Sequence, residues 1–318
     1  MREDLNSLLR RTRIISGSVL FFYAATHLLN HSLATFSIAA ADAARIYFIA
    51  FWRNPVAEIL LFASFALHIL LGVQSVLGRK SFKMTGREWV QMIFPFVALL
   101  ALIPHVLTTA IMSRLFGVND NYELIFAATI IDPAKASANV IFFSLMVILI
   151  WTHGAIGIHG LMKYRPTYAR LQRPIMGFFW AVPVLALMGF FSGLKEMSFL
   201  TYAHSQLHED YYMMTLVMKA IPQEAFPVAA MIEMMTMNYY PLVLLALIVL
   251  AVGNVVRTRF FGRVTITYPH GKTVKVASGT TILEASRIAK IPHQSVCGGK
   301  GRCTTCRVRI VSSDGALP

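Results

Sequence analysis

The chain has 318 residues, of which 56% are hydrophobic and only 14% are charged, and its formal net charge is +14. Soluble domains carry about 25% charged residues, so this composition excludes an ordinary soluble protein. The positive charge does not indicate a nucleic acid partner, because lysine and arginine lie in short clusters between long apolar runs. Loops of membrane proteins have this pattern, and we therefore expect a protein embedded in a lipid bilayer.

Six apolar stretches meet or approach the length of about 20 residues that a helix needs to cross the hydrocarbon core. They cover residues 14–36, 55–77, 89–112, 136–162, 174–194 and 239–256. The first stretch has the basic flank of a signal peptide but is too long for one, so we expect a retained helix. The sequence thus predicts an all-α transmembrane bundle of six helices over residues 1–260.

Lysine and arginine gather at alternate ends of these stretches, which predicts the orientation of the bundle. The basic ends are the N-terminal tail, the loops after the second and fourth stretches, and the exit from the sixth, with Arg2, Arg10, Arg11, Arg13, Arg79, Lys80, Lys83, Arg87, Lys163, Arg165, Arg170, Arg173, Arg257, Arg259 and Arg263. Because positive loops stay in the cytoplasm, both termini are expected there.

The segment 195–238, between the fifth and sixth stretches, is too long for a simple turn. It contains Pro222 and Pro227 and a methionine-rich stretch. We expect short helices here, lying on the outer face of the bundle. His204 and His208 are one helical turn apart in this segment and form either a surface metal site or a solvated face.

Six histidines lie within or at the edge of the first four apolar stretches. They are His27, His31, His68, His105, His153 and His159. An ionisable residue at membrane depth is costly and usually functional. A hydrogen bond between helices would explain any single histidine, but one histidine in each of four successive helices favours a shared role.

The depths of four histidines sharpen this expectation. At about 1.5 Å per residue, His68 and His153 lie roughly 13 Å from the inner ends of their helices, while His27 and His105 lie roughly 20–25 Å from theirs. The histidines therefore form two pairs at two depths, and each pair joins two helices. Two neutral imidazoles on facing helices are the axial ligands that a haem iron needs.

The first four stretches resemble the dihaem cytochrome b anchor of succinate dehydrogenase and fumarate reductase. The matching segments are His27-Leu28-Leu29-Asn30, His68-Ile69-Leu70-Leu71-Gly72, His105-Val106 and His153-Gly154-Ala155-Ile156-Gly157. In that family one histidine from each of the first four helices is a ligand, paired one with three and two with four. The resemblance implies two b-type haems, an outer one on His27 and His105 and an inner one on His68 and His153.

Three further residues have roles that stay open at this point. His31 is one turn from His27, so it either replaces His27 as the ligand or bonds a haem propionate. His159, near the cytoplasmic interface, has either a propionate role or none. The resemblance also implies quinone or quinol as substrate, and Glu58 is either its proton acceptor or an interfacial carboxylate.

The three cysteines, Cys297, Cys303 and Cys306, have the spacing C-x5-C-x2-C in a glycine-rich loop. Thiolates bind iron, and glycines let the backbone fold closely over the sulfides of a cluster, whereas a zinc ribbon would need two CxxC pairs. Strands at 264–268 and 273–276 and a helix at 281–289 precede the loop, and a strand at 307–311 follows it.

This arrangement resembles the [2Fe–2S] ferredoxin fold of the adrenodoxin-like kind. We expect a truncated α+β (β-grasp) ferredoxin domain over 261–318, with a fourth cysteine ligand outside this chain.

The domain order resembles the N-terminal half of bacterial class III adenylate cyclases that have a six-helix membrane anchor. The segments from Ile158-His159-Gly160-Leu161 to Pro183-Val184-Leu185-Ala186-Leu187, and the cysteine loop, fit that family. The resemblance implies a homodimer in a bacterial inner membrane whose redox state regulates a cyclase domain beyond residue 318. This chain itself offers no assignable pair of cyclase metal-binding aspartates, so it is not expected to convert ATP.

Two alternatives remain. The chain could be a quinone-reactive cytochrome b and ferredoxin carrier that passes electrons to a soluble partner in a respiratory complex, or a membrane anchor without haem.

Overall fold

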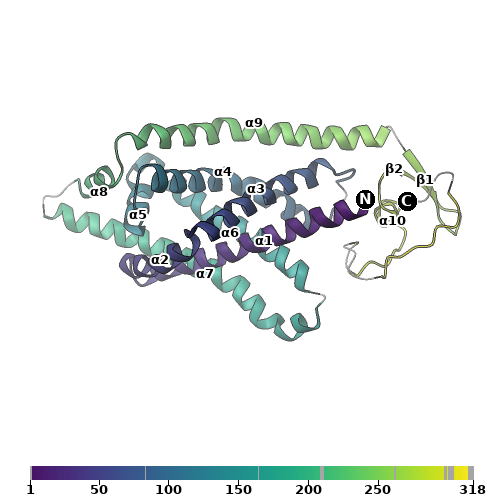
Figure 1. Cartoon of the computed structure of the whole chain (residues 1–318), viewed down its shortest axis with the longest axis horizontal. Helices are drawn as coiled ribbons and strands as arrows, with labels where there is room; N and C mark the ends of the chain where they lie inside the picture. Colours follow the sequence, from purple (N-terminus) through teal and green to yellow (C-terminus); the bar gives the residue numbers. More distant parts are fainter. Residues whose placement is uncertain are drawn as a thin grey trace. The chain divides into compact units, whose positions relative to one another are not determined.

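The computed structural model describes residues 2–82, 84–163, 165–207, 211–260, 263–296, 299 and 304–313, without the side chains of residues 2–4, 6 and 259. Its elements follow one another along the chain as shown in Figure 1. They are α1 (Arg2–Ser32), a 3-10 turn η1 (Leu33–Thr35), α2 (Ile38–Trp52), α3 (Pro55–Leu77), α4 (Gly86–Leu115), α5 (Tyr122–Ile130), α6 (Pro133–Met162), α7 (Pro166–Ser205), α8 (Tyr212–Ala220), α9 (Ala225–Phe260), β1 (Arg263–Thr267), β2 (Thr273–Ala277) and α10 (Ile282–Ile288).

Five helices of the described chain are long and apolar enough to cross a membrane: α3, α4, α6, α7 and the part of α9 from Ala225 to Thr258. Many of their large apolar side chains are exposed, and Ser64 is the only buried residue of α3. Such helices are stable only where lipid covers these side chains, so the chain is a membrane protein. α1 is not among the five, and its role as a sixth membrane helix stays a prediction.

The expected apolar stretches coincide with helices, but most of these helices are longer. The stretch 55–77 matches α3 from end to end, whereas α7 continues to Ser205 and α9 begins at Ala225. The expectation of several short helices in 195–238 was therefore wrong. Within the described part of that segment α8 is the one short helix, and the rest prolongs its neighbours because their apolar periodicity continues past the hydrocarbon length.

Helix α2 was not predicted from the sequence. Its 15 residues are too few to span a membrane, and the Ser37 side chain accepts a hydrogen bond from the Ala40 amide at its start. The Ile38 amide at the same end donates to Glu196 Oε2 on α7 at 2.8 Å. Trp52, at the other end, is buried and donates to Thr26 Oγ1 on α1 at 3.1 Å. These contacts fix α2 against α1 and α7.

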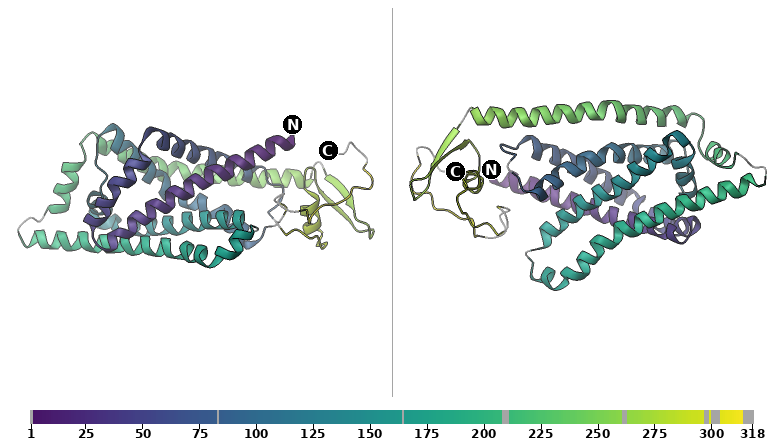
Figure 2. Two further views of the ribbon diagram at one scale, coloured as in Figure 1. Left: turned by 60° about the horizontal axis from the view of Figure 1, so that its bottom comes forward. Right: turned by 180° about the vertical axis from the view of Figure 1, so that it is seen from behind.

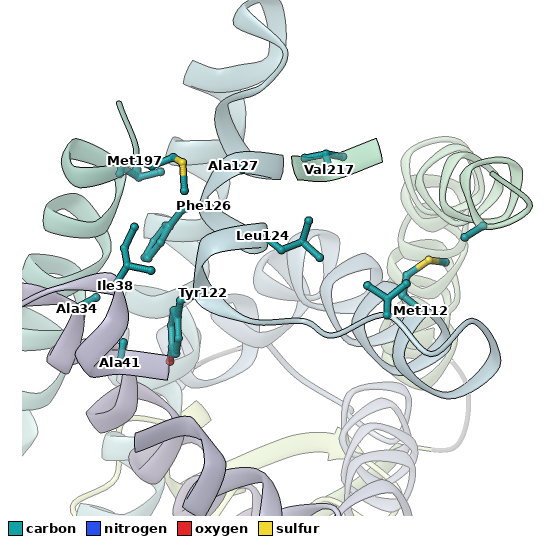
Figure 3. Close-up of a cluster of buried hydrophobic side chains, with 13 residues drawn as sticks. Ala34, Ile38, Ala41, Met112, Tyr122, Leu124, Phe126, Ala127, Met197 and Val217 are labelled. Carbon is teal, nitrogen blue, oxygen red and sulfur yellow. The ribbon is translucent and has the colours of Figure 1, made fainter. Parts of the chain in front are cut away.

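A buried cluster joins α2, α5 and α7 (Figure 3). Ile38, Tyr122, Phe126 and Met197 pack together there, and Phe126 is among the largest fully buried side chains. Gly193 lies against the Phe126 ring, and a methyl group at this position would overlap the ring. The small residue is therefore what allows α7 to approach α5 closely.

α1 and α7 also lie side by side (Figure 2). A Cβ atom at Gly189 of α7 would come within 2.9 Å of the His31 carbonyl carbon and 3.0 Å of Ser32 Cα, closer than real contacts allow. The end of α1 that carries His31 is thus set by a backbone-to-backbone contact.

The chain forms two compact units, residues 1–75 with 86–247, and residues 76–85 with 248–318. In the second unit β1 and β2 pair antiparallel, with Arg263 opposite Ala277 and Thr267 opposite Thr273. The Thr281 side chain and Glu284 close a capping box at the start of α10. The boundary expected at residue 260 between the membrane and iron–sulfur domains stays a prediction.

The predicted strand at 307–311 is not found, and this prediction was wrong. Its alternating residues suit a strand, but the described backbone there has no ladder partner. A strand needs a neighbour to satisfy its amides, and alternation alone does not supply one.

Candidate haem and iron–sulfur sites

The inner histidine pair meets across two helices. His68 on α3 and His153 on α6 have ring centroids 6.1 Å apart, with the rings inclined at 75°. One iron between two imidazole nitrogens would place the ring centres about 6.2 Å apart, from two bonds of about 2.0 Å and about 1.1 Å from each nitrogen to its ring centre. The spacing fits a bis-imidazole iron.

Hydrogen bonds at the Nδ1 atoms of both rings favour the Nδ1–H tautomer, in which Nε2 can bind a metal. His153 Nδ1 lies 3.0 Å from the Gln91 carbonyl oxygen, to which it can donate, and 3.3 Å from Gln91 Nε2, which can only donate. The carbonyl oxygen is the nearer of the two groups and favours a proton on Nδ1. The Ser16 hydroxyl donates to the Arg13 carbonyl at 3.2 Å and is 3.2 Å from His68 Nδ1, from which it accepts. Both Nε2 lone pairs are then available to a metal.

Ser16 and Gly17 of α1 form a seat for His68. A Cβ atom at Gly17 would lie 2.7 Å from His68 Cε1 and 3.2 Å from its Nδ1, so only glycine leaves room for the ring. Ser16 is buried, with 3% of its surface exposed. Ser64 is the only buried residue of α3, so the contacts with Ser16 and Gly17 largely determine where the His68 ring lies.

The outer pair joins α1 to α4. His27 and His105 have ring centroids 6.2 Å apart with an inclination of 49°, again the spacing of two imidazoles on one iron. Tyr23 stacks on His27 with centroids 5.5 Å apart and an inclination of 13°. The Tyr122 ring meets His31 edge-on at 5.2 Å.

His31 contacts the His27 nitrogen that a haem iron would need. The Nε2 atoms of the two rings are 3.1 Å apart, so one carries the proton and the other accepts it. Only one of these nitrogens can face a metal at a time, and the choice between them stays open. Within the described chain no three His, Cys, Asp or Glu side chains are grouped closely enough to hold a metal ion.

Aromatic side chains lie between the two pairs. Phe21 of α1 packs on Trp151 of α6 with centroids 4.9 Å apart, and it contacts Phe179 of α7 edge-on at 6.0 Å. Gly154, next to His153, leaves the space that Phe21 fills.

Gly17 and His27 are ten residues apart on α1, so the two sites are separated by about 15 Å along that helix.

Glu58 has a partner that the sequence did not reveal. It forms an ion pair with Arg114 near the end of α4, and the Arg114 guanidinium lies 5.3 Å from the centre of the Phe62 ring. A role for Glu58 in proton uptake would require this ion pair to open.

Polar groups outside the membrane-spanning helices lie near the outer pair. Asp120 pairs with both Arg45 and Arg53. Asp42 Oδ1 accepts a hydrogen bond from the Tyr122 amide at 2.8 Å, but burial raises the pKa of the Asp42 carboxyl. Burial likewise raises the pKa of the Tyr122 hydroxyl, which accepts from Asn30 Nδ2 at 2.6 Å. Sequence patterns gave no sign of this network, because its members are far apart in the chain.

Of the three predicted cluster ligands, only Cys306 is described, and it is half-buried; Cys297 and Cys303 lie outside the described residues. A hydrogen-bond chain reaches Cys306. The Tyr268 hydroxyl is 2.9 Å from Ser286 Oγ, which is 2.8 Å from His293 Nδ1, and His293 Nε2 is 3.2 Å from the Cys306 carbonyl oxygen. This chain ties the cysteine loop to β1 and α10, and the sequence analysis missed His293.

His159 and His204 each have a local aromatic partner. His159 Nδ1 is 2.6 Å from the Tyr168 hydroxyl, which gives it a local partner. His204 stacks on Tyr212 with centroids 3.9 Å apart, and Tyr212 donates to Glu123 Oε1 at 2.7 Å. His208 lies outside the described residues, so the pairing expected for His204 stays a prediction.

Comparison with known proteins identifies one part of the chain. Residues 266–317 match the family described as the 2Fe-2S iron-sulfur cluster binding domain. No curated protein and no solved structure matches the chain. The class that the fold and this match define is a membrane protein of apolar helices with a [2Fe–2S] ferredoxin-type domain in its C-terminal region, which supports iron–sulfur electron transfer.

Proposed function

We propose that the chain is a membrane electron-transfer module that holds two b-type haems in its helical bundle and a [2Fe–2S] cluster in its ferredoxin-type domain. The observation that carries this proposal is the pair of cross-helix imidazole contacts, with ring centroids at 6.1 and 6.2 Å. A haem at either site would supply a one-electron Fe(III)/Fe(II) couple within the apolar interior.

The chain's own residues have separate tasks in this proposal. His68 and His153 bind the inner haem, and His105 with His27 or His31 binds the outer one. Ser16 and the Gln91 carbonyl keep the inner ligands in the Nδ1–H tautomer. Cys297, Cys303 and Cys306 supply three thiolates to the cluster.

A visible difference spectrum, reduced minus oxidised, of the detergent-purified chain tests the proposal, with haem quantified as its pyridine complex. We expect two b-type haems per chain. A preparation that has no haem after expression with ample iron and haem precursor would contradict the proposal and favour a membrane anchor without haem.

We further propose quinone or quinol as the membrane substrate and Glu58 as a proton acceptor at the outer end of α3. Glu58 faces Arg114, and opening of this ion pair would free the carboxylate. The test is the rate of haem reduction by a soluble quinol in the Glu58→Gln variant. A rate equal to that of the unaltered chain would exclude this role.

For the output we propose regulation of an adenylate cyclase domain, in a homodimer of the bacterial inner membrane with both termini cytoplasmic. The support is the resemblance in domain order. A cyclase domain in frame downstream of residue 318 would agree with this output. A flavoprotein encoded beside the chain, without such a domain, would favour the electron carrier that serves a soluble partner.

A further inference from the structure

Nearly all of the net positive charge belongs to one of the two compact units. Residues 76–85 and 248–318 contain fourteen lysine and arginine residues against two acidic ones, Glu284 and Asp314, so this unit carries twelve of the chain's fourteen net charges. A small domain needs a net charge of only about 2–8 to stay soluble. The positive charge above this amount indicates a negatively charged binding partner.

The unit contains the ends of two membrane helices, α3 and α9. The apolar part of α9 reaches Thr258, and two residues separate Phe260 from Arg263 at the start of β1. Those residues can extend at most about 3.5 Å each, so the strand starts close to the bilayer surface. The loop 76–85, which follows the membrane helix α3, is held to α9 because Asn254 Nδ2 donates to the Leu77 and Arg79 carbonyl oxygens, each at 3.0 Å.

Several cations gather at this end of the unit. Arg263 and Lys275 are exposed and lie on the same face of the strand pair, because the register places Lys275 opposite Thr265. Val276 on the other face is buried. Lys80 donates to the Ser278 carbonyl just after β2, and buried Arg79 Nε lacks a hydrogen-bond partner in the described chain. We call Arg79, Lys80, Arg263 and Lys275 the basic face.

No carboxylate in the described part of this unit balances the basic face. Glu284, its one described acidic residue, is engaged in the capping box of α10. Clusters of four to eight lysine and arginine residues next to a membrane helix attract anionic lipids. The short connection to α9 keeps the basic face within reach of the bilayer, which is the nearest source of negative charge.

We propose that the basic face binds the phosphate headgroups of anionic phospholipids in the bilayer that α9 crosses. This contact holds the ferredoxin-type domain against the membrane surface. It does not depend on haem, so the proposed function and this inference can fail separately.

Amide hydrogen exchange of the full chain in nanodiscs tests the inference, with discs of phosphatidylcholine alone compared with discs that contain phosphatidylglycerol. We expect slower exchange in residues 76–82, β1 and β2 in the phosphatidylglycerol discs. The protection should disappear at 1 M salt, where the Debye length is about 3 Å. In the double variant Arg263→Gln, Lys275→Gln it should fall by roughly fivefold for each cation removed.

The matched control is Arg287→Gln, Lys290→Gln, which removes the same charge at α10 and just beyond it. Exchange in α10 also reports whether either variant remains folded. Equal loss of protection in both variants would overturn the basic face as the site. Equal exchange in both kinds of disc would overturn lipid binding, and protection by poly-glutamate alone would then indicate an acidic protein partner.

Discussion

His68 and His27 have different surroundings, although each lies about the same distance from its partner ring. The His68 ring is held from one side by Ser16 and Gly17, and no hydrogen bond within the described chain reaches its Nε2. The His27 ring instead has the His31 nitrogen at 3.1 Å. The proposed inner site would therefore be preorganised for haem, whereas a haem at the proposed outer site would require the His27–His31 contact to break first.

Single histidine variants test the two pairs. We expect His68→Ala or His153→Ala to remove the inner haem and keep the outer one, which is about half of the total haem, because a b-type haem needs both axial imidazoles. Pyridine haemochrome quantification measures the loss. Equal loss of both haems would contradict the pairing.

The outer ligand is distinguished in the same way. If His27 is the ligand, His27→Ala should remove the outer haem while His31→Ala retains it, because the remaining imidazole at position 27 still faces His105. The reverse result would assign the ligand to His31. Low-spin haem signals in electron paramagnetic resonance report the outcome.

Ser16→Ala should raise the reduction potential of the inner haem alone. The Nδ1–H bond to Ser16 strengthens the imidazole as a donor and so stabilises ferric iron; its loss is worth about 1 kcal/mol, or about 40 mV for one electron. Redox titration measures the shift. Ser18→Ala is the control, because Ser18 lines a different surface of α1. A shift of the outer haem by the same amount would show that the effect is not local.

At the scale of helices, close packing at Gly189 positions the end of α1 that carries His27 and His31. Gly189 of α7 meets the backbone of His31, so a side chain there must push the end of α1 away. Gly177 on the same helix has open space around its Cβ position. The two glycines thus form a matched pair for experiment.

We expect Gly189→Ala to displace His27 and His31 and to lower the outer haem content, with a loss of helix contact of about 1–3 kcal/mol from overpacking. Gly177→Ala should leave both haems unchanged. Haem stoichiometry and the thermal midpoint of the purified protein are the measurements. A similar effect of the two substitutions would indicate that the α1–α7 contact does not position the site.

The sequence predicted the long elements well because apolar length and periodicity are local signals. The helix at 55–77 was predicted to the residue, and β1, β2 and α10 were predicted within one or two residues. α2 was missed because its 15 residues are fewer than the length that a helix needs to cross a membrane, and only stretches near that length were sought. The pairs of histidines followed from depth along a helix, whereas Ser16, Gly17 and His293 act through contacts between distant segments.

At the scale of the whole molecule, the bundle and the ferredoxin-type domain should bind their cofactors independently. We expect Cys306→Ser, in a protein that includes the fourth ligand, to abolish the iron–sulfur signal and leave haem content unchanged, because thiolates hold the cluster and imidazoles hold the haems. Electron paramagnetic resonance and haem quantification measure the two. Simultaneous loss of haem would show that the units depend on each other.

The hydrogen bonds from Asn254 to the Leu77 and Arg79 carbonyls also order events during synthesis of the protein. The two partners are 177 and 175 residues apart in the chain. At about 5–20 residues per second, a ribosome makes Asn254 on the order of ten seconds or more after Leu77. The loop after α3 therefore has no partner until α9 has been translated. Residues 263–313 of the ferredoxin-type domain are made only after α9, on a chain in which α3, α4, α6 and α7 already exist.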